Sequence, residues 1–227
     1  MADGFEIDFR ESVAAVALEV KPRGSMAGVI LSAGASRRMG TPKALLRYQG
    51  ETFLDRLIRV MSSACGRVVV VLGHDADLIR GGVSQRDDVL FTINPDPERG
   101  MLSSLQCGLR MTPPETEAIF FTPVDHPNIS LVTMEALAQA FEERHAPVTV
   151  PVYRGTRGHP VCIARSLAAE LLDLPLDAQA ADVIHRHTAG RQLVEVDDPG
   201  VVADIDDPDA YRALIAAESG APKAANP

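Results

Sequence analysis

The sequence predicts an α/β fold: a Rossmann-like, doubly wound, mostly parallel mixed sheet with helices on both faces. Segments with strand character alternate with segments with helical character along the chain, as in sheets built from successive strand–helix–strand units. Several predicted strands are continuous apolar runs, which is typical of strands covered on both faces. No stretch resembles a linker between domains. We therefore expect one domain.

Local patterns place the individual elements. Apolar runs predict strands at residues 27–33, 67–73, 89–94, 118–125, 148–153, 160–166 and 191–197. Apolar residues at helical spacing predict helices at residues 52–64, 75–80, 101–111, 131–145, 166–173, 178–188 and from Pro208 onward. Two short strands around the turn RGTRGHP interrupt the alternation, and this interruption indicates a mixed sheet.

The two ends of the chain differ from its middle. Residues 1–25 lack a clear period, so we expect a flexible N-terminal extension or leader. Residues 218–227 are small and rich in Pro and Ala, and we expect a disordered tail. The predicted domain spans residues 26–217.

Composition limits the classes of function. The chain of 227 residues has a net charge of −9 at pH 7, which argues against a general nucleic-acid or anionic-membrane surface. No apolar stretch has the length of a membrane-spanning helix. Three cysteines lie far apart without CxxC spacing, at Cys65, Cys107 and Cys162. Neither a disulfide framework nor a zinc ribbon is expected, and a reducing cytoplasm fits best.

A glycine-containing, basic loop follows the first predicted strand, where residues 31–43 read LSAGASRRMGTPK. The loop lacks the Walker spacing, because five residues separate Gly34 from Gly40, and it lacks the G-x-G of the dinucleotide fingerprint. Backbone N–H groups around a glycine turn can still form an anion nest, with basic side chains as countercharge. Four basic residues occur within eleven residues that contain no acid: Arg37, Arg38, Lys43 and Arg47. A phosphate-binding loop and a turn with solvated arginines are the two alternatives.

Acidic residues follow two later segments. Asp125 ends the apolar strand AIFFTPVD, where a carboxylate facing the basic loop would suit Mg²⁺. Asp125 could instead cap the next helix, although Asn128 or Ser130 is better suited to that role. Asp204 and Asp206 alternate along a predicted strand, which would place both side chains on one face.

Other polar residues have simpler interpretations. Asp207 should point away from Asp204 and cap the last helix. His185 and His187 are two residues apart on a predicted helix, so they face different directions and are interpreted as surface histidines.

The loop LSAGASRRMGTPK and four later segments together resemble one protein family. The loop matches the L-x-A-G-x-S-x-R-M-G-x-x-K signature of the MobA-like nucleotidyltransferases, and the segments NPDPERGMLSSL, VDHP, GTRGHP and DIDDP follow in the family's order. The resemblance spans about residues 26–215 and is greatest to the molybdenum cofactor cytidylyltransferase branch. It implies a fold of the nucleotide-diphospho-sugar transferase type. It also implies attack by an acceptor phosphate on the α-phosphorus of a nucleoside triphosphate, with release of pyrophosphate.

The resemblance implies roles for individual residues. Arg38, Lys43 and Asp125 would be catalytic, and Mg²⁺ would be held by Asp125 with Asp206 or Asp204, of which we favour Asp206. The nucleotide would be bound by Leu31, Ala33, Gly34, Ala35, Ser36, Lys43, Asn94, Gly100, Met101 and Ser104, with Ser103 as the alternative to Ser104.

The resemblance also implies an acceptor side. Arg157 and His159, in the turn GTRGHP, would contact the acceptor. Arg37 occupies a variable place in the signature and is expected to be a solvated arginine, and His126 receives no role. Many molybdopterin-type relatives carry a G-D-x-G-A-R stretch, and the matching segment here, LDAQAADVI, lacks its second glycine and its arginine.

The expected protein is a cytoplasmic, Mg²⁺-dependent nucleotidyltransferase. Ala33 stands where guanylyl-transferring relatives usually have glycine, which favours CTP. The acceptor would be a small phosphorylated molecule, with molybdopterin as the leading candidate and a molybdoenzyme as a partner. The alternatives are a relative that uses GTP or another acceptor, a nucleotide-binding accessory protein without turnover, and a nicotinamide-dependent oxidoreductase. The last is disfavoured by the missing G-x-G-x-x-G.

Overall fold

Eight strands form the central sheet of the computed structural model, which describes residues 23–84, 87–175 and 178–220. The strands are β1 (Arg23–Ser32), β4 (Cys65–Leu72), β5 (Val89–Ile93), β6 (Ala118–Pro123), β7 (Val148–Tyr153), β8 (Thr156–Arg157), β9 (Val161–Ala164) and β10 (Gln192–Glu195). Their order is β10-β7-β9-β6-β1-β4-β5, with β8 paired to β7. A separate two-stranded sheet pairs β2 (Arg47–Tyr48) with β3 (Glu51–Thr52).

The sheet is mixed, as the sequence predicts. Strands β6, β1, β4 and β5 are mutually parallel, and β10 is parallel to β7. Strand β9 is antiparallel to both of its neighbours, β6 and β7. The hairpin from β7 to β8 turns at Arg154 and Gly155, which have φ of 48° and 81°, as a turn with two left-handed residues requires.

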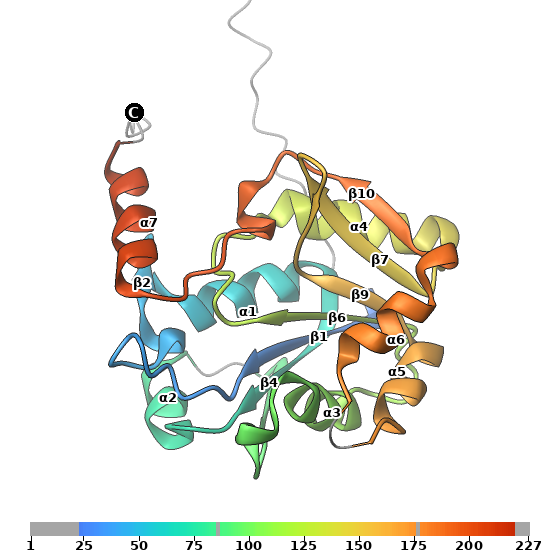
Figure 1. Cartoon of the computed structure of the whole chain (residues 1–227), viewed down its shortest axis with the longest axis horizontal. Helices are drawn as coiled ribbons and strands as arrows, with labels where there is room; N and C mark the ends of the chain where they lie inside the picture. Colours follow the sequence, from blue (N-terminus) through green and yellow to red (C-terminus); the bar gives the residue numbers. More distant parts are fainter. Residues whose placement is uncertain (1–22, 85–86, 176–177, 221–227) are drawn as a thin grey trace, which may run out of the picture.

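Helices cover both faces of the sheet (Figure 1). They are α1 (Phe53–Ala64), α2 (Ala76–Gly82), α3 (Met101–Met111), α4 (Leu131–Arg144), α5 (Arg165–Leu172), α6 (Ala180–Arg186) and α7 (Pro208–Gly220). Short 3₁₀ helices are η1 (Lys43–Leu45), η2 (Pro97–Arg99), η3 (Thr188–Gly190) and η4 (Pro199–Val201). No helix in the described ranges is both long and apolar enough to cross a membrane.

Alternating side chains of the central strands form two hydrophobic clusters. Ile30 of β1 belongs to the cluster under α1 and α4, whereas Val29 and Leu31 belong to the cluster under α3 and α5. Because successive strand residues point to opposite faces, one continuous apolar run supplies both clusters. Partly buried residues of α7 pack against the first cluster, and the rings of Tyr211 and Phe53 meet edge to face at 5.9 Å between centroids.

Two predicted helix caps are confirmed. Ser130 accepts a hydrogen bond from the backbone N–H of Thr133 at the start of α4. Asp207 accepts from the N–H groups of Asp209 and Ala210 at the start of α7. Both contacts satisfy backbone donors that a helix start leaves without an intrahelical partner.

Strand β1 and helix α7 extend past the predicted limits of the domain. Strand β1 begins at Arg23, whose guanidinium forms ion pairs with Glu135 and Glu142 of α4 at 2.8 and 2.7 Å. Residues 23–25 therefore lie in the sheet and not in an extension, and residues 1–22 lie outside the described residues. Helix α7 continues to Gly220, and the rest of the predicted tail, residues 221–227, also lies outside them.

Two helical glycines allow a test of the packing. A Cβ at Gly108 of α3 would lie 2.4 Å from a methyl of Val29, whereas a Cβ at Gly81 of α2 would have nothing within 4 Å. Gly108→Ala should lower the free energy of unfolding by about 1–3 kcal/mol because overpacking outweighs the better helix propensity. Gly81→Ala should raise it by about 0.5–1 kcal/mol. Urea unfolding measures both, and equal effects of the two variants would contradict the close approach of α3 to β1.

Candidate active site

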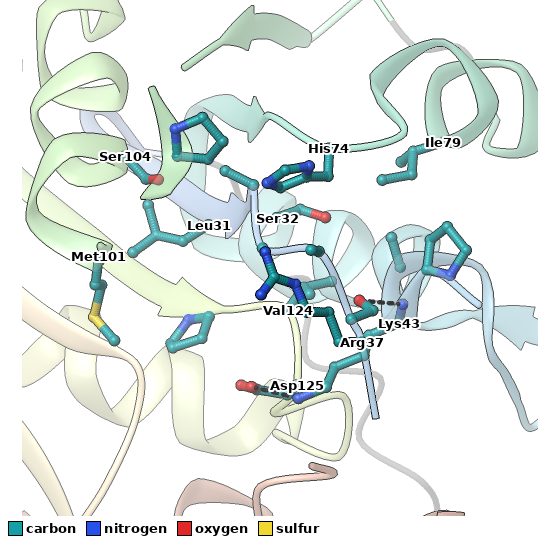
Figure 2. A pocket seen from close by; sticks show the side chains of 18 of the residues that line it. Leu31, Ser32, Arg37, Lys43, His74, Ile79, Met101, Ser104, Val124 and Asp125 are labelled. Atoms are coloured by element: carbon teal, nitrogen blue, oxygen red, sulfur yellow. Dashed lines mark hydrogen bonds and ion pairs between the residues drawn. The ribbon is translucent and has the colours of Figure 1, made fainter. Parts of the chain in front are cut away.

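A cavity of about 420 Å³ lies beyond the carboxyl ends of β1, β4, β5 and β6, where α/β sheets commonly bind ligands. Figure 2 shows Met101 and Ser104 at one end of the cavity and Lys43 at the other. Its lining includes most of the residues for which the sequence predicts a nucleotide, catalytic or metal role: Leu31, Ala33, Gly34, Ala35, Ser36, Arg38, Lys43, Gly100, Met101, Ser104, Asp125 and Asp206.

The loop after β1 is a closed turn. Ser36 has φ of 48°, its carbonyl accepts from the N–H of Met39 at 2.9 Å, and its hydroxyl accepts from the N–H of Lys43 at 3.0 Å. A Cβ at Gly34 would have nothing within 4 Å, and Gly34 does not have a positive φ. Neither packing nor backbone conformation therefore requires glycine at this position.

The ammonium of Lys43 holds two carboxylates. Its Nζ lies 2.6 Å from Oδ1 of Asp206 and 3.1 Å from Oδ2 of Asp125, and the Lys43 side chain is only 12% exposed. The other oxygen of Asp206, Oδ2, accepts from the guanidinium of Arg38 at 2.9 Å. Three segments that are distant in the sequence therefore meet at one charge cluster: the basic loop, the end of β6 and the segment before α7.

Hydrogen bonds hold both carboxylates ionised. Burial alone would raise the pKa of Asp125, but hydrogen bonds from Nδ1 of His126 at 3.0 Å and from Lys43 outweigh it and lower the pKa to about 2. The hydrogen bond from Lys43, together with that from Arg38, lowers the pKa of Asp206. Asp125 therefore stays an anion under neutral and mildly acidic conditions.

The predicted strand through Asp204 and Asp206 is wrong. Residues 202–207 form no strand, because the N–H of Ile205 donates to the carbonyl of Asp125 at 2.8 Å and holds the segment across the end of β6. Asp206 reaches the cavity, whereas Asp204 is exposed and does not line it. The preference for Asp206 over Asp204 agrees with this geometry.

A second charged bridge crosses the cavity. Glu98 Oε1 lies 3.1 Å from the guanidinium of Arg37 and 3.1 Å from Nε2 of His74. Arg37 is 77% exposed, as expected of a solvated arginine, but it has this partner. Arg47 lies outside the cavity lining, and its guanidinium donates to the carbonyl of Gly50.

The charges in the cavity balance. The basic side chains of Arg37, Arg38 and Lys43 each pair with a carboxylate, from Glu98, Asp206 or Asp125. The basic loop has no acid near it in sequence, but the fold brings carboxylates from three other segments to it. The three basic side chains therefore give the site no net positive charge.

Asn94 lies outside the cavity lining and holds two serines at the start of α3 by hydrogen bonds. Its side chain is buried, does not line the cavity, and donates to the hydroxyls of Ser103 and Ser104 at 2.8 and 3.0 Å. Ser103 donates in turn to the carbonyl of Gly100. Of the two serines, Ser104 lines the cavity. Asn94 is thus placed to position the start of α3 and not to contact a ligand directly.

Arg157 and His159 line a different cavity, of about 480 Å³. A chain of contacts connects residues of the two cavities, because the rings of His159 and His126 lie 4.7 Å apart and His126 contacts Asp125. Burial and the neighbouring His126 lower the pKa of His159 to about 4. His185 and His187 lie away from both cavities, and His187 contacts Glu170. Asp177, in the segment LDAQAADVI, lies outside the described residues.

The donor set at the first cavity suits a hard cation that keeps other ligands. In the described part of the chain, no three or more His, Cys, Asp and Glu side chains are grouped to hold a metal. Two carboxylates, Asp125 and Asp206, meet at Lys43. Mg²⁺ usually takes one or two carboxylates and completes its shell with phosphate oxygens and water. The residues present fit such an ion.

Sequence reasoning missed three polar residues of the site. His74 follows β4, and its position just after a strand could have marked it as a candidate site residue. Glu98 lies within the segment NPDPERG, and its partners, Arg37 and His74, come from two other segments. His126 follows Asp125 directly, and its role comes from its hydrogen bond to that neighbour.

Comparisons with known proteins point to one family. The family model described as the MobA-like NTP transferase domain matches residues 28–192. The molybdenum cofactor cytidylyltransferase of Escherichia coli K12 is 25% identical over 185 residues, which cover 81% of this chain and 92% of that protein. A probable molybdenum cofactor guanylyltransferase of Bacillus cytotoxicus is 30% identical over 138 residues, which cover 59% of this chain and 65% of that protein.

A solved structure also resembles the chain closely. The crystal structure of Rv0371C from Mycobacterium tuberculosis H37Rv in complex with manganese superposes with a TM-score of 0.72 at 25% identity. The match covers 85% of this chain and 98% of that chain. The predicted fold type and the predicted family are confirmed.

The pKa of His159 predicts a dependence of stability on pH. The unfolded state binds a proton near pH 6.5 and the folded state only near pH 4, so the free energy of unfolding should fall as the pH drops through this window, by at most about 3 kcal/mol. The low pKa of Asp125 contributes nothing there, since its stabilisation is lost only below about pH 3.8. Urea unfolding of the wild type and His159→Gln at pH 7 and 4.5 measures the effect. If His159→Gln loses as much stability between pH 7 and pH 4.5 as the wild type does, the pH dependence does not come from a buried, neutral His159.

Proposed function

Because the chain belongs to the MobA-like NTP transferase family, we propose that it transfers a cytidylyl group from CTP to a small phosphorylated acceptor. An oxygen of the acceptor phosphate forms a bond to the α-phosphorus, the bond from the α-phosphorus to the bridging oxygen breaks, and pyrophosphate leaves. The observation that supports this best is the cluster of Lys43 with Asp125 and Asp206 beside the loop at residues 33–36.

The charge balance of the site explains why the triphosphate would enter with a cation. Arg37, Arg38 and Lys43 are already neutralised by carboxylates, so a free triphosphate would meet little net attraction. Asp125 and Asp206 would hold a divalent ion in place of these contacts. The ammonium of Lys43 and the guanidinium of Arg38 would then be free to pair with phosphate oxygens. Each of these charged groups would keep a partner of opposite charge.

Asp125 and Asp206 would hold Mg²⁺, which when bound offsets charge on the α-phosphate and on the departing pyrophosphate. His126 would keep the Asp125 carboxylate oriented through its 3.0 Å hydrogen bond. The backbone of residues 33–36 would cradle the phosphates, and Arg38 and Lys43 would offset developing charge. In this reaction class alignment and electrostatic stabilisation supply most of the catalysis. The manganese complex of the mycobacterial relative supports a divalent ion.

The end of the cavity away from Lys43 would bind the base. Leu31 and Met101 offer apolar surface, and Ser104 offers a hydroxyl whose oxygen is already held by Asn94. CTP is favoured by Ala33 and by the cytidylyltransferase relative, which matches 81% of this chain. GTP is the second candidate, because the guanylyltransferase relative is more identical over a shorter stretch.

Molybdopterin is the proposed acceptor, since both relatives are named for the molybdenum cofactor. Arg157 and His159 would contact it from the second cavity. The reaction would take place in the cytoplasm, and the product would pass to a molybdoenzyme. A nucleotide-binding accessory protein would bind the triphosphate and release no pyrophosphate, which the turnover assay below separates from an enzyme.

Thermal unfolding with CTP, GTP, ATP, UTP and NADH, each with and without Mg²⁺, tests nucleotide choice. A ligand at about a hundred times its dissociation constant adds about 2.7 kcal/mol, which for a chain of this size raises Tm by about 5–10 °C. We expect this rise with CTP and Mg²⁺ together. A rise with GTP instead would transfer the proposal to guanylyl transfer, and no rise with any triphosphate would refute it.

A pair of neighbouring aspartates tests the metal site. Asp206→Asn should raise the Mg²⁺ concentration for half-maximal pyrophosphate release, with CTP and molybdopterin as substrates, by about tenfold or more. Asp204→Asn removes the same charge from an exposed position outside the cavity and should leave that concentration unchanged. Asp125→Asn should abolish the metal-dependent turnover.

Unfolding midpoints of the three variants without ligand provide the folding control. Turnover that survives Asp125→Asn with the same Mg²⁺ dependence would remove Asp125 as a ligand. Equal effects of the Asp204 and Asp206 variants would show that the segment acts through general charge and not through coordination.

A further inference from the structure

The second cavity combines polar and apolar lining residues with two guanidinium groups. It lies beside the β7–β8 hairpin and β9, and its volume of about 480 Å³ is that of a small-molecule site. Val150, Val161 and Ile184 supply apolar surface, while Arg157 and Arg191 supply positive charge. Arg191 belongs to none of the motifs that the sequence analysis singles out.

The two guanidinium groups have no countercharge. Within residues 23–84, 87–175 and 178–220, neither the Arg157 nor the Arg191 side chain forms a hydrogen bond or ion pair, whereas the basic groups of the first cavity are all paired. Burial and the charge of Arg157 lower the pKa of Arg191. The chain has a net charge of −9, yet none of its described carboxylates lies in this cavity lining. Like charges left unpaired cost stability, which a bound anion would offset.

The second cavity borders the proposed reaction centre. His159 lines it, and the His159 ring lies 4.7 Å from that of His126, which contacts Asp125. The Nδ1 atom of His159 is buried and has no hydrogen-bond partner among the described residues. The backbone here is fixed, because the N–H of His159 donates to the carbonyl of Val201 at 2.8 Å. The second cavity is therefore separated from Asp125 by two contacting side chains, those of His159 and His126.

We propose that Arg191 and Arg157 together bind a second anionic group of the acceptor, remote from the phosphate that attacks. The acceptor is then a small molecule with an apolar or heterocyclic body and anionic groups at two ends. Arg191 is the specificity-determining residue, because a neutral acceptor body would leave the half-buried Arg191 and its neighbour Arg157 as two like charges without a countercharge. This inference rests on the proposed function, since it takes the first cavity as the nucleotide site.

Titration with inorganic phosphate tests the anion site directly. The side-chain Nε–H resonances of Arg157, Arg191 and Arg154 are followed by NMR at constant ionic strength, with CTP and Mg²⁺ present. Arg154 is the matched control, because it lies on the same hairpin but outside the cavity, 5.0 Å above the Tyr153 ring. We expect the Arg157 and Arg191 resonances to shift with one dissociation constant and the Arg154 resonance to stay in place.

Substitutions extend the test. Arg191→Gln should weaken phosphate binding at Arg157 by about tenfold or more, as expected for the loss of a charge-assisted contact, and Arg154→Gln should not. With CTP saturating and molybdopterin as the acceptor, Arg191→Gln should raise the acceptor KM by about tenfold with the CTP KM unchanged. The rise in Tm with CTP should also persist, which shows that the variant folds.

The outcomes separate this inference from the proposed function. If Arg157 and Arg191 shift no more than Arg154, or if Arg191→Gln leaves phosphate binding unchanged, the anion site is refuted. If the CTP and acceptor KM values rise together, Arg191 acts through the fold and the inference is also overturned. If the wild type binds no triphosphate, the proposed function fails, while the phosphate titration still decides whether the second cavity binds anions.

Discussion

The contact of one ammonium with two carboxylates organises the active site. Lys43 reaches Asp125, 82 positions away, and Asp206, 163 positions away. Each of these charges would be costly in a half-buried cavity if it stood alone. Held together, they fix the basic loop, the end of β6 and the segment before α7 around one space. The cluster also leaves the cavity nearly neutral. A triphosphate would therefore be attracted more strongly there if it entered together with a divalent cation.

Backbone hydrogen bonds position the segments that carry these three side chains. The N–H of Val124 donates to the carbonyl of Leu31, and the N–H of Ile205 donates to the carbonyl of Asp125. The loop after Asp125 is held from outside as well. Arg56 donates to the carbonyl of Pro127, and the buried Asp198 accepts from the N–H of Ser130. Asp125 is therefore held in place by hydrogen bonds to its own segment and to the segments on either side of it.

The two cavities differ in whether their basic side chains are paired with carboxylates. In the first, Glu98, Asp125 and Asp206 neutralise every basic side chain of the loop. In the second, Arg157 and Arg191 face the space without a carboxylate. A metal–nucleotide complex suits the first arrangement, and an anion without a metal suits the second. The His126–His159 pair lies at the boundary between them.

The sequence by itself determined most of the secondary structure, the mixed sheet and most of the residues that line the first cavity. Period, capping and the strand-end rule are local, and α3 begins and ends where its spacing predicts, at Met101 and Met111. Only the tertiary structure decided which charges meet, because Lys43, Asp125 and Asp206 come together through strand order and not through spacing. For the same reason, the predicted strand through Asp206 failed, since a hydrogen bond to another segment replaced it. The positions of Glu98, His126 and Arg191 in the two cavities likewise depend on tertiary packing that no local pattern encodes.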